Sequence, residues 1–433
     1  MNMNKKSGLA LSALVAAAAA LGGCGGQQAK SPEPGNASAP EAVGAEPVTI
    51  TILSTGGLPE AELDMMYAIA MKQYPHITIK KSTGKIENLI AAGETPDIII
   101  THTGNIDSYQ DFNLLTDITP LVKKHKTDLG KLDQVALNAH RVTKPDELNG
   151  LPFWENFVAL YYNKDIFDKF GVPYPRDGMT WDETIELAKK VSREDGGVKY
   201  QGLAQYAIQR FGRIMGATLY DTKNRKGTFE TPEWKSVFEL VGKIHSIPGN
   251  EAPVPFTTAR NDSFLKSRDL AMYATVNLLT QLVEAGKSGM NWDVVQYPSL
   301  PGHKDVFDEV NAGSLAITGT SKHKDAAMQV LTAFVSDEMQ SMIARKLARQ
   351  TAMRDPKFNN ELGADIPELK GKNIAGIFKS RAVELKNRGK YVGQVGTILE
   401  KHFVSYYTNQ TDVNSALRAA NEEVNKLLEA AAK

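Results

Sequence analysis

Apolar and polar positions alternate along this chain in a way that predicts strands and helices in turn from residue 48 onward. Residues 48–53 form a β-branched, apolar run that predicts a strand, and the small residues 54–57 predict a loop after it. Pro59 begins a segment with apolar residues at steps of three and four, which predicts a helix with one buried stripe formed by Leu63, Met66, Tyr67, Ala70, Met71 and Tyr74. Residues 76–80 and 98–100 predict two further strands. Strands that alternate with helices indicate a parallel sheet covered on both faces, so we predict an α/β fold.

Two of these strands end in polar loops, residues 54–57 and 101–107. In parallel sheets, ligands bind beyond the carboxyl ends of the strands. The candidate side chains at these ends are Thr55, His102, Thr103, Asn105 and Asp107. A lone histidine such as His102 is more often an ordinary loop or surface residue than a ligand contact, and that alternative stays open.

Three later segments carry clear helix signals. Thr180 and Glu183 have the spacing of a capping box, and Thr231-Pro232 places proline at the first position of another helix. Near the C-terminus, a long amphipathic stripe predicts a closing helix; its positions are Val413, Ala416, Leu417, Ala420, Val424, Leu427 and Leu428.

The first 47 residues predict export rather than a folded domain. Lys5 and Lys6 precede the apolar residues 9–21, a stretch too short to span a bilayer, and Leu21-Gly22-Gly23-Cys24 follows. This ending resembles the lipobox of bacterial lipoproteins, which implies a signal peptide over residues 1–23 and lipidation of Cys24. An incidental or buried thiol after an ordinary signal is the alternative. Residues 25–47 are rich in Gly, Pro, Ala and Ser, so we expect residues 24–47 to form a lipidated, flexible tether.

Length and charge limit the remaining possibilities. Residues 48–433 are too many for one small core, so two lobes are expected. The 50 basic and 50 acidic residues balance, and removing Lys5 and Lys6 leaves 48 against 50, which gives no basic field for nucleic acid. We therefore expect no nucleic-acid partner.

Common catalytic and metal-binding motifs are missing from the sequence. Gly286-Lys287-Ser288 resembles the end of a phosphate loop, but Gln281 stands where its leading glycine belongs. No Gly-x-Ser-x-Gly elbow occurs, and the eight histidines are at least fifteen residues apart, so no His-Glu-x-x-His zinc helix exists. We predict no cofactor, no metal and no enzymatic activity; a glycosidase carboxylate pair drawn from distant loops stays open as the alternative.

Several motifs, in order along the chain, resemble one family. The strongest is Leu148-Asn149-Gly150-Leu151-Pro152 followed by Ala159-Leu160-Tyr161-Tyr162-Asn163-Lys164-Asp165-Ile166-Phe167. Further matches are Gly171, Pro175, Thr180-Trp181-Asp182-Glu183, Thr95-Pro96-Asp97, residues 115–121 and Lys324-Asp325-Ala326-Ala327. Together they resemble the extracellular solute-binding proteins of ABC importers, in particular the sugar-binding family that includes maltose-binding protein.

The resemblance implies a two-lobed, periplasmic-binding-protein-like α/β fold with a hinge between the lobes. It places the first crossing near residues 154–160, the return near residues 306–320 and another crossing near Thr351. The first lobe would hold residues 48–159 plus 306–351, and the second residues 160–305 plus 352–433. Solute would bind in the cleft, and the lobes would close around it by a hinge motion.

Candidate ligand residues follow from the chemistry of sugars, which stack on aromatic faces and bond to planar polar side chains. Trp154 is the leading candidate, since it lies on the segment that enters the hinge; a core tryptophan is the equal alternative. Glu155 and Asn156 beside it would bond hydroxyls or the hinge backbone. In the second lobe, Tyr206 and Arg210 belong to an aromatic and cationic cluster that a helical surface would explain equally well.

One departure from the family pattern concerns the segment after Ala271-Met272. Members often have a glycine and then a tryptophan there, whereas this chain has Val276, Asn277 and Leu278. If that tryptophan stacks on sugar in other members of the family, the cleft of this chain lacks one aromatic stacking surface. Asn277 and Asn311 would then compensate through hydrogen bonds.

We therefore predict a non-enzymatic receptor that captures a carbohydrate, foremost an oligosaccharide, and delivers it to the transmembrane subunits of an ABC permease. It would be a monomer anchored by lipid to the cell membrane and facing the extracellular side. A receptor for a peptide or polyol, a surface glycan-degrading enzyme and a sensor coupled to a kinase are the alternatives.

Overall fold

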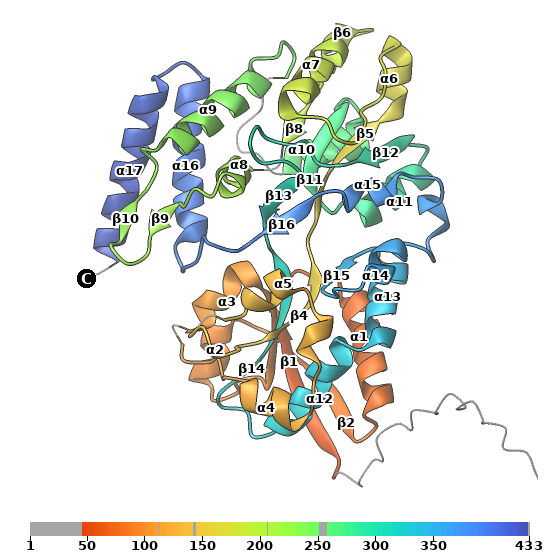
Figure 1. Cartoon of the computed structure of the whole chain (residues 1–433), viewed down its shortest axis with the longest axis vertical. Coiled ribbons are helices and arrows are strands. Elements are labelled where there is room, and N and C mark those ends of the chain that lie inside the picture. The colour runs from red at the N-terminus through yellow and green to blue at the C-terminus, as the bar shows by residue number, and fades with distance from the viewer. Residues whose placement is uncertain (1–45, 111, 142–143, 206, 251–257, 432–433) are drawn as a thin grey trace, which may run out of the picture. The chain divides into compact units, whose positions relative to one another are not determined.

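The computed structural model describes residues 46–110, 112–141, 144–205, 207–250 and 258–431. Cys24, the predicted signal and the predicted tether up to residue 45 lie outside these residues, as does Tyr206. Two α/β lobes are present, as predicted, and each is built around its own sheet (Figure 1).

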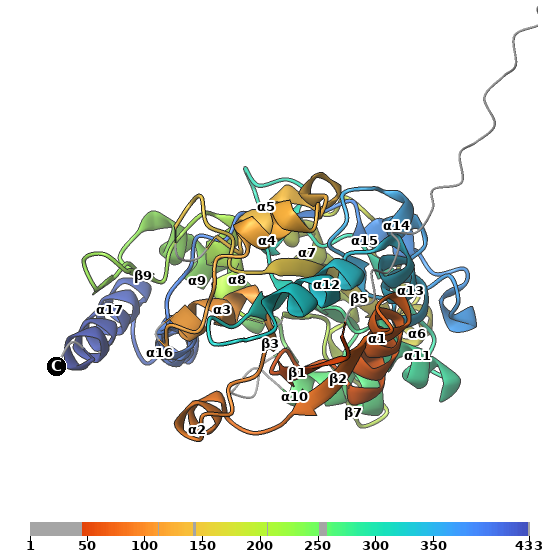
Figure 2. The same cartoon turned by 90° about the horizontal axis from the view of Figure 1, so that it is seen from below.

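The first lobe contains a six-stranded sheet in the order β15-β4-β14-β3-β1-β2. Its elements are β1 (Val48–Ser54), α1 (Glu60–Gln73), β2 (Ile77–Ser82), α2 (Ile86–Ala91), β3 (Ile98–His102), α3 (Thr103–Gln110), α4 (Thr119–Lys124), η1 (Leu129–Lys131), α5 (Gln134–Asn138), β4 (Leu151–Glu155), β14 (Ala312–Ile317), α12 (Lys324–Phe334), α13 (Asp337–Leu347), β15 (Gln350–Thr351) and α14 (Lys357–Asn360). Alternation along β3 sends Ile98 and Ile100 into the core under α1, α12 and α13, and Ile99 into a smaller core with residues of α2 and α3. Helices therefore cover both faces of this sheet (Figure 2).

The second lobe contains a four-stranded sheet in the order β12-β5-β11-β8. Its elements are β5 (Val158–Asn163), α6 (Lys164–Phe170), α7 (Trp181–Val191), β6 (Arg193–Asp195), β7 (Val198–Tyr200), β8 (Ala204–Gln205), α8 (Gln209–Ile214), β9 (Tyr220–Asp221), β10 (Lys226–Gly227), α9 (Pro232–His245), α10 (Thr258–Asp262), η2 (Ser263–Ser267), β11 (Met272–Val276), α11 (Leu279–Lys287), β12 (Trp292–Val295), β13 (Val306–Glu309), η3 (Pro367–Leu369), α15 (Ile374–Ile377), β16 (Arg381–Val383), α16 (Val392–Tyr407) and α17 (Val413–Ala430). One large core, which includes all of β5 except Asn163, joins the sheet to α7, α9, α16 and α17.

Two extended segments carry the chain directly between the sheets. The first runs from β4 to β5 and the second from β13 to β14, and the two lie side by side where the Asn156 amide donates to the Asn311 carbonyl at 2.8 Å. Beside them, β13 pairs in parallel with β16. Met353 and Phe358, beyond β15, pack into the core of the first lobe.

The segments with clear local signals form the helices that the sequence predicted. Thr180 and Glu183 make both bonds of the capping box of α7, and the Thr231 hydroxyl caps α9 by accepting from the Trp234 amide. Asn163 caps α6, and Gly171 ends it at a φ of 62°, a conformation that favours glycine. Five of the seven positions of the predicted C-terminal stripe are buried along α17, and the other two, Val413 and Leu427, are half-buried.

Two expectations were wrong in detail. The sheets are mixed rather than parallel: β1 pairs in parallel with β2 and β3, but β14 runs antiparallel to both β3 and β4. The reason is that β14 enters the sheet from the second lobe and so runs against its neighbours. Residues 101–107 are also not a loop, because β3 continues to His102 and α3 begins at once at Thr103.

No helix in the described part of the chain is long and apolar enough to cross a membrane.

Candidate functional site

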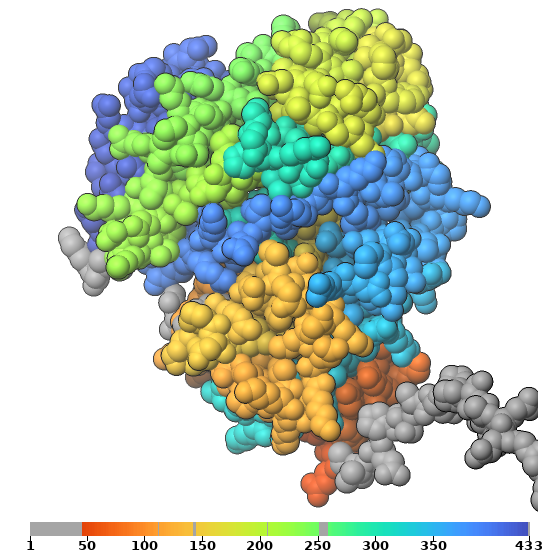
Figure 3. Space-filling model, in the orientation of Figure 1, coloured from red at the N-terminus to blue at the C-terminus, as the bar shows by residue number. Residues whose placement is uncertain are grey.

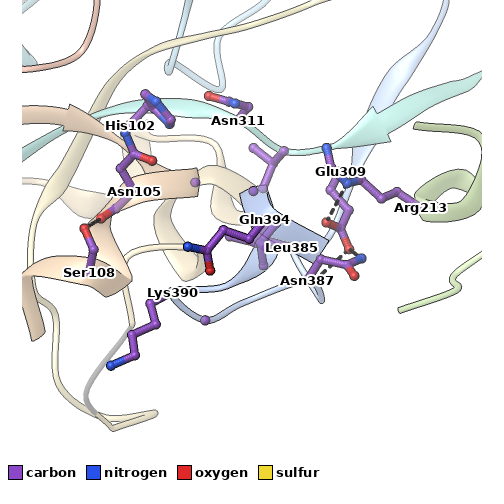
Figure 4. Close-up of a pocket in the computed structure, with 15 residues that line it drawn as sticks. His102, Asn105, Ser108, Arg213, Glu309, Asn311, Leu385, Asn387, Lys390 and Gln394 are labelled. Carbon is purple, nitrogen blue, oxygen red and sulfur yellow. Dashed lines mark hydrogen bonds and ion pairs between the residues drawn. The ribbon is translucent and has the colours of Figure 1, made fainter. Parts of the chain in front are cut away.

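A cavity of about 410 Å³ lies between the lobes at the second crossing, within the size range of small-molecule sites (Figure 4). The first lobe contributes the start of α3, and the second contributes α8, the end of β13 and the segment around the start of α16. The lining residues are His102, Gly104, Asn105, Ser108, Arg213, Glu309, Val310, Asn311, Leu385, Asn387, Gly389, Lys390, Val392, Gly393 and Gln394.

Arg213 and Glu309 line one wall of this cavity and belong to a network of four charged side chains, whose other members, Arg210 and Asp308, are not among the lining residues. Arg210 and Arg213 are three residues apart on α8 and so share one side of the helix. Nη1 of Arg210 lies 2.6 Å from Oδ2 of Asp308, and Nη1 of Arg213 lies 3.7 Å from the same oxygen. The Nε of Arg213 lies 3.9 Å from Oε2 of Glu309, too far for a hydrogen bond.

The two oxygens of Glu309 have different surroundings. Oε1 accepts three bonds from the loop of residues 384–391: the amides of Lys386 at 2.8 Å and Asn387 at 3.0 Å, and the Asn387 side chain at 2.8 Å. Oε2 is buried and has no hydrogen-bond partner. Burial raises the pKa of this carboxyl, while Arg213 and the bonds from Asn387 and Lys386 act in the opposite direction.

Four buried polar atoms without hydrogen-bond partners belong to residues that line the cavity. They are Nδ1 of His102, Nε of Arg213, Oε2 of Glu309 and Oδ1 of Asn311. Burial also lowers the pKa of His102, so its imidazole is neutral at neutral pH. Because a buried polar atom without a partner is costly, these atoms indicate where a polar ligand would bind.

The loop of residues 384–391 connects the lobes beside the cavity. Arg388 forms an ion pair with Asp107 at 3.1 Å and donates to the Ala139 carbonyl at 2.7 Å, and the Gly389 amide donates to Asp107 at 3.0 Å. Asn387 holds the same loop to the second lobe by accepting from the Leu219 amide and donating to the Ala217 carbonyl. In the space-filling view, the blue surface of the late chain lies against the gold surface of the first lobe (Figure 3).

Among the residues predicted from the sequence, the structure brings His102, Asn105 and Asn311 together at this cavity. His102 and Asn105 lie on one side and Glu309 and Arg213 on the other, with Asn311 on the strand between them (Figure 4). Asp107 lies next to the cavity, where the bonds from the loop already occupy both of its oxygens.

Other predicted residues make contacts within the protein. The Thr55 hydroxyl is 2.8 Å from the Tyr109 hydroxyl, and the Thr103 hydroxyl donates to the Val310 carbonyl and accepts from the Ala312 amide. Asn277 donates to the Ala348 carbonyl at 2.9 Å and accepts from the Leu279 amide at 2.9 Å, just before the start of α11. Arg210 is buried in its pair with Asp308.

The residues of the first crossing are largely buried and do not line this cavity. Trp154 is 5% exposed, lies in the core of the first lobe and has the Arg349 guanidinium 5.4 Å from its ring centroid. Glu155 is buried, and burial raises the pKa of its carboxyl well above the usual range, with Asp133 adding to the shift. Asn156 is half-buried and bonds through its backbone to Asn311.

Sequence reasoning missed Arg213, Glu309, Asn387, Lys390 and Gln394. One signal was available for Glu309, because two successive acids interrupt an otherwise apolar strand at residues 306–310. Buried carboxylates are rare without partners or a role, so this pair was a candidate from composition alone. No local pattern indicates that the segment beginning near residue 385 faces the same cavity.

Within the ranges that the structure describes, no group of three or more His, Cys, Asp or Glu side chains is arranged to hold a metal ion.

Comparison with known proteins gives consistent results. A family profile described as bacterial extracellular solute-binding protein matches residues 60–341, well over half of the chain. A relative in Rhizobium meliloti, an sn-glycerol-3-phosphate-binding periplasmic protein, is 24% identical over 307 residues, which cover 67% of this chain and 70% of that protein.

Two solved structures show the same fold. The ABC substrate-binding protein of Listeria monocytogenes in complex with cycloalternan superposes with a TM-score of 0.71 at 20% identity, covering 88% of this chain and 99% of that one. The cyclic α-maltosyl-1,6-maltose binding protein of Arthrobacter globiformis gives a TM-score of 0.70 at 15% identity, with the same coverage of both chains.

Proposed function

The chain belongs to the family of bacterial extracellular solute-binding proteins, and on this premise we propose that it is the carbohydrate receptor of an ABC importer. The observation that carries the proposal is the cavity between the lobes, where both lobes contribute buried polar atoms that have no hydrogen-bond partner among the described residues. Sugar hydroxyls both donate and accept, so they suit a wall that contains donors and acceptors.

The mechanism is a shift of population between open and closed arrangements. A solute that contacts His102 of the first lobe and Arg213 of the second stabilises the closed arrangement by the contacts that only this arrangement provides. The two crossings would act as the hinge, because they are the extended segments by which the chain passes from one lobe to the other. The predicted bounds were residues 48–159 plus 306–351 for the first lobe and 160–305 plus 352–433 for the second. We propose moving β13 to the second lobe, because it pairs with β16, and residues 352–360 to the first, because Met353 and Phe358 pack into its core.

The remaining assignments follow from the same premise. The closed receptor presents its solute to the transmembrane subunits of the permease as a monomer and performs no catalysis. Cys24 carries the lipid that holds it on the outer side of the cell membrane, and residues 25–47 form the tether. Structures of relatives named for oligosaccharides support carbohydrate as the solute class, and oligosaccharide is the leading form.

A thermal-shift screen of the purified protein tests this proposal. The panel contains neutral mono- and oligosaccharides, polyols, short peptides and sn-glycerol 3-phosphate, the last because of the relative in Rhizobium meliloti. A solute at a hundred times its dissociation constant adds about 2.7 kcal/mol to the stability, a shift of several degrees. A rise with one saccharide series supports the proposal. A rise confined to peptides overturns the carbohydrate assignment, and new reducing ends from incubated glycans overturn the non-enzymatic one.

A further inference from the structure

The charged wall of the cavity is electrically balanced. Arg210 is paired with Asp308 at 2.6 Å, and Arg213 lies within 4 Å of both Asp308 and Glu309. Two guanidinium groups therefore face two carboxylates. Lys390 is the other cationic side chain lining the cavity, and it is exposed. An anionic ligand would thus meet no unbalanced buried cation among the described lining residues.

A hydrogen-bond donor and a hydrogen-bond acceptor lie next to each other on this wall. The Nε of Arg213 is a donor, the Oε2 of Glu309 is an acceptor, and both are buried and lack hydrogen bonds although only 3.9 Å separates them. A hydroxyl supplies one proton to donate and two lone pairs to accept. A hydroxyl, or two neighbouring ones, seated here would satisfy both atoms at once.

A phosphate group suits this pair poorly. Near neutral pH its terminal oxygens are mainly acceptors, so they can bond to Arg213 but not to the Glu309 carboxylate. The like charge of Glu309 would also repel the phosphate within a partly buried site. Asn311, whose Oδ1 is a second unpartnered acceptor on the cavity wall, favours a donor in the same way.

Building on the proposed function, we infer that Arg213 and Glu309 recognise the hydroxyls of an uncharged polyhydroxy solute, and that phosphorylated solutes bind more weakly. Glu309 then sets the specificity of the receptor, because its free oxygen accepts from a sugar and repels an anion. This assignment separates the chain's solute from the one for which its relative in Rhizobium meliloti is named.

Glu309→Gln is the informative variant because it replaces one of the two carboxylate oxygens and keeps the other. Its amide oxygen can keep the three bonds that Oε1 accepts from Lys386 and Asn387, while the amide nitrogen replaces the acceptor at Oε2. Isothermal titration of the full-length protein compares neutral saccharides such as glucose and maltose with their phosphorylated counterparts and with sn-glycerol 3-phosphate. Glu338→Gln is the matched control, since Glu338 forms an exposed pair with Lys72 on the first lobe.

The wild type should bind a neutral saccharide at least tenfold more tightly than its phosphorylated counterpart. Glu309→Gln should lower the affinity for the neutral saccharide by about tenfold to a hundredfold, because a hydrogen bond to a charged group is lost. The same variant should leave the affinity for the phosphorylated solute unchanged or increase it. A structural role for Glu309 alone would instead weaken both solutes in parallel.

Each outcome separates this inference from the proposed function. Equal or tighter binding of the phosphorylated solute by the wild type overturns the inference but leaves a solute receptor. A neutral saccharide that binds Glu309→Gln as it binds wild type overturns the role of Glu309 alone. If no saccharide binds, whether phosphorylated or not, the proposed function is overturned and this inference with it. If Glu309→Gln melts far below wild type, Arg213→Gln provides the second test: it should weaken the neutral saccharide at least tenfold, and unchanged binding would contradict the inference.

Discussion

The two crossings between the lobes carry similar residues in very different surroundings. The first contains Glu155 and Asn156, and the second contains Glu309 and Asn311. Glu155 is enclosed near Asp133 and does not line the interlobe cavity, whereas Glu309 has one oxygen bonded to a loop and the other unpartnered on the cavity wall. The first crossing is enclosed as core, whereas the second lines the cavity.

The difference lies in what packs against each crossing. Trp154 fills the space beside the first, with its indole over Gly313, where a Cβ atom would come within 1.9 Å of the indole nitrogen. The second crossing faces α8 and the loop of residues 384–391, which supply Arg213 and Asn387. A buried glutamate therefore costs stability at the first crossing, whereas at the second one its free oxygen faces the cavity and is the group we propose for solute recognition.

The largest expected effect is on the first crossing. Trp154→Ala should lower the free energy of unfolding of the ligand-free protein by about 3–5 kcal/mol, because it leaves a cavity in the core of the first lobe. Denaturant unfolding at equilibrium measures this loss. If the stability is unchanged while saccharide affinity falls, Trp154 is a ligand contact and the contrast between the crossings is wrong.

Gly313 offers an internal check on that prediction. Gly313→Ala should destabilise the protein by about 1–3 kcal/mol, because the new methyl group overlaps the Trp154 indole. Combined with Trp154→Ala, the same change should cost much less, because the overlap is gone. Additive losses in this double-mutant cycle would contradict the packing of Trp154 over Gly313.

Glu155 gives a pH-dependent test of intermediate size. Its pKa is raised in the folded state, so the native protein binds this proton more tightly than the unfolded chain, and its contribution to stability is lost as pH rises above the unfolded value of about 4.3. Glu155→Gln should therefore raise the free energy of unfolding at pH 7 by about 1 kcal/mol or more and flatten its decline above pH 5. Urea unfolding between pH 4 and pH 8 measures both effects; a variant that is less stable at pH 7 would show that the charged form is needed.

The smallest expected effect concerns the loop beside the second crossing. Arg388→Gln removes the ion pair with Asp107, which joins the lobes, so saccharide affinity should fall by up to about tenfold as the closed arrangement loses support. High salt should reduce the difference from wild type, because the pair is partly exposed. Arg345→Gln is the control, since it breaks a similar pair with Asp365 away from the cavity. Equal affinities of wild type and Arg388→Gln would show that the loop does not support closure.

Much of the fold could be predicted from short segments. The strands at residues 48–53 and 98–100, the capping box at Thr180 and the stripe along α17 depend on neighbours within a few residues, and all of them formed. The direction of β14 could not be predicted in this way, because it depends on the chain leaving for the second lobe and returning. Part of the site could be predicted in the same way, because His102 and Asn311 lie at or near strand ends, which the sequence pattern indicates.

Patterns within the sequence were enough to predict two α/β lobes, an N-terminus with the features of an exported lipoprotein and the motifs of a solute-binding family. These conclusions rest on local periodicity and on ordered motifs. Which of the two similar crossings faces a cavity depends on long-range packing. Arg213, Glu309 and Asn387 are distant in sequence and meet because α8 and one loop pack against β13. Burial and the lack of a hydrogen bond at Oε2, rather than residue type, are the reasons to propose Glu309 as a recognition group, and both are properties of the folded chain.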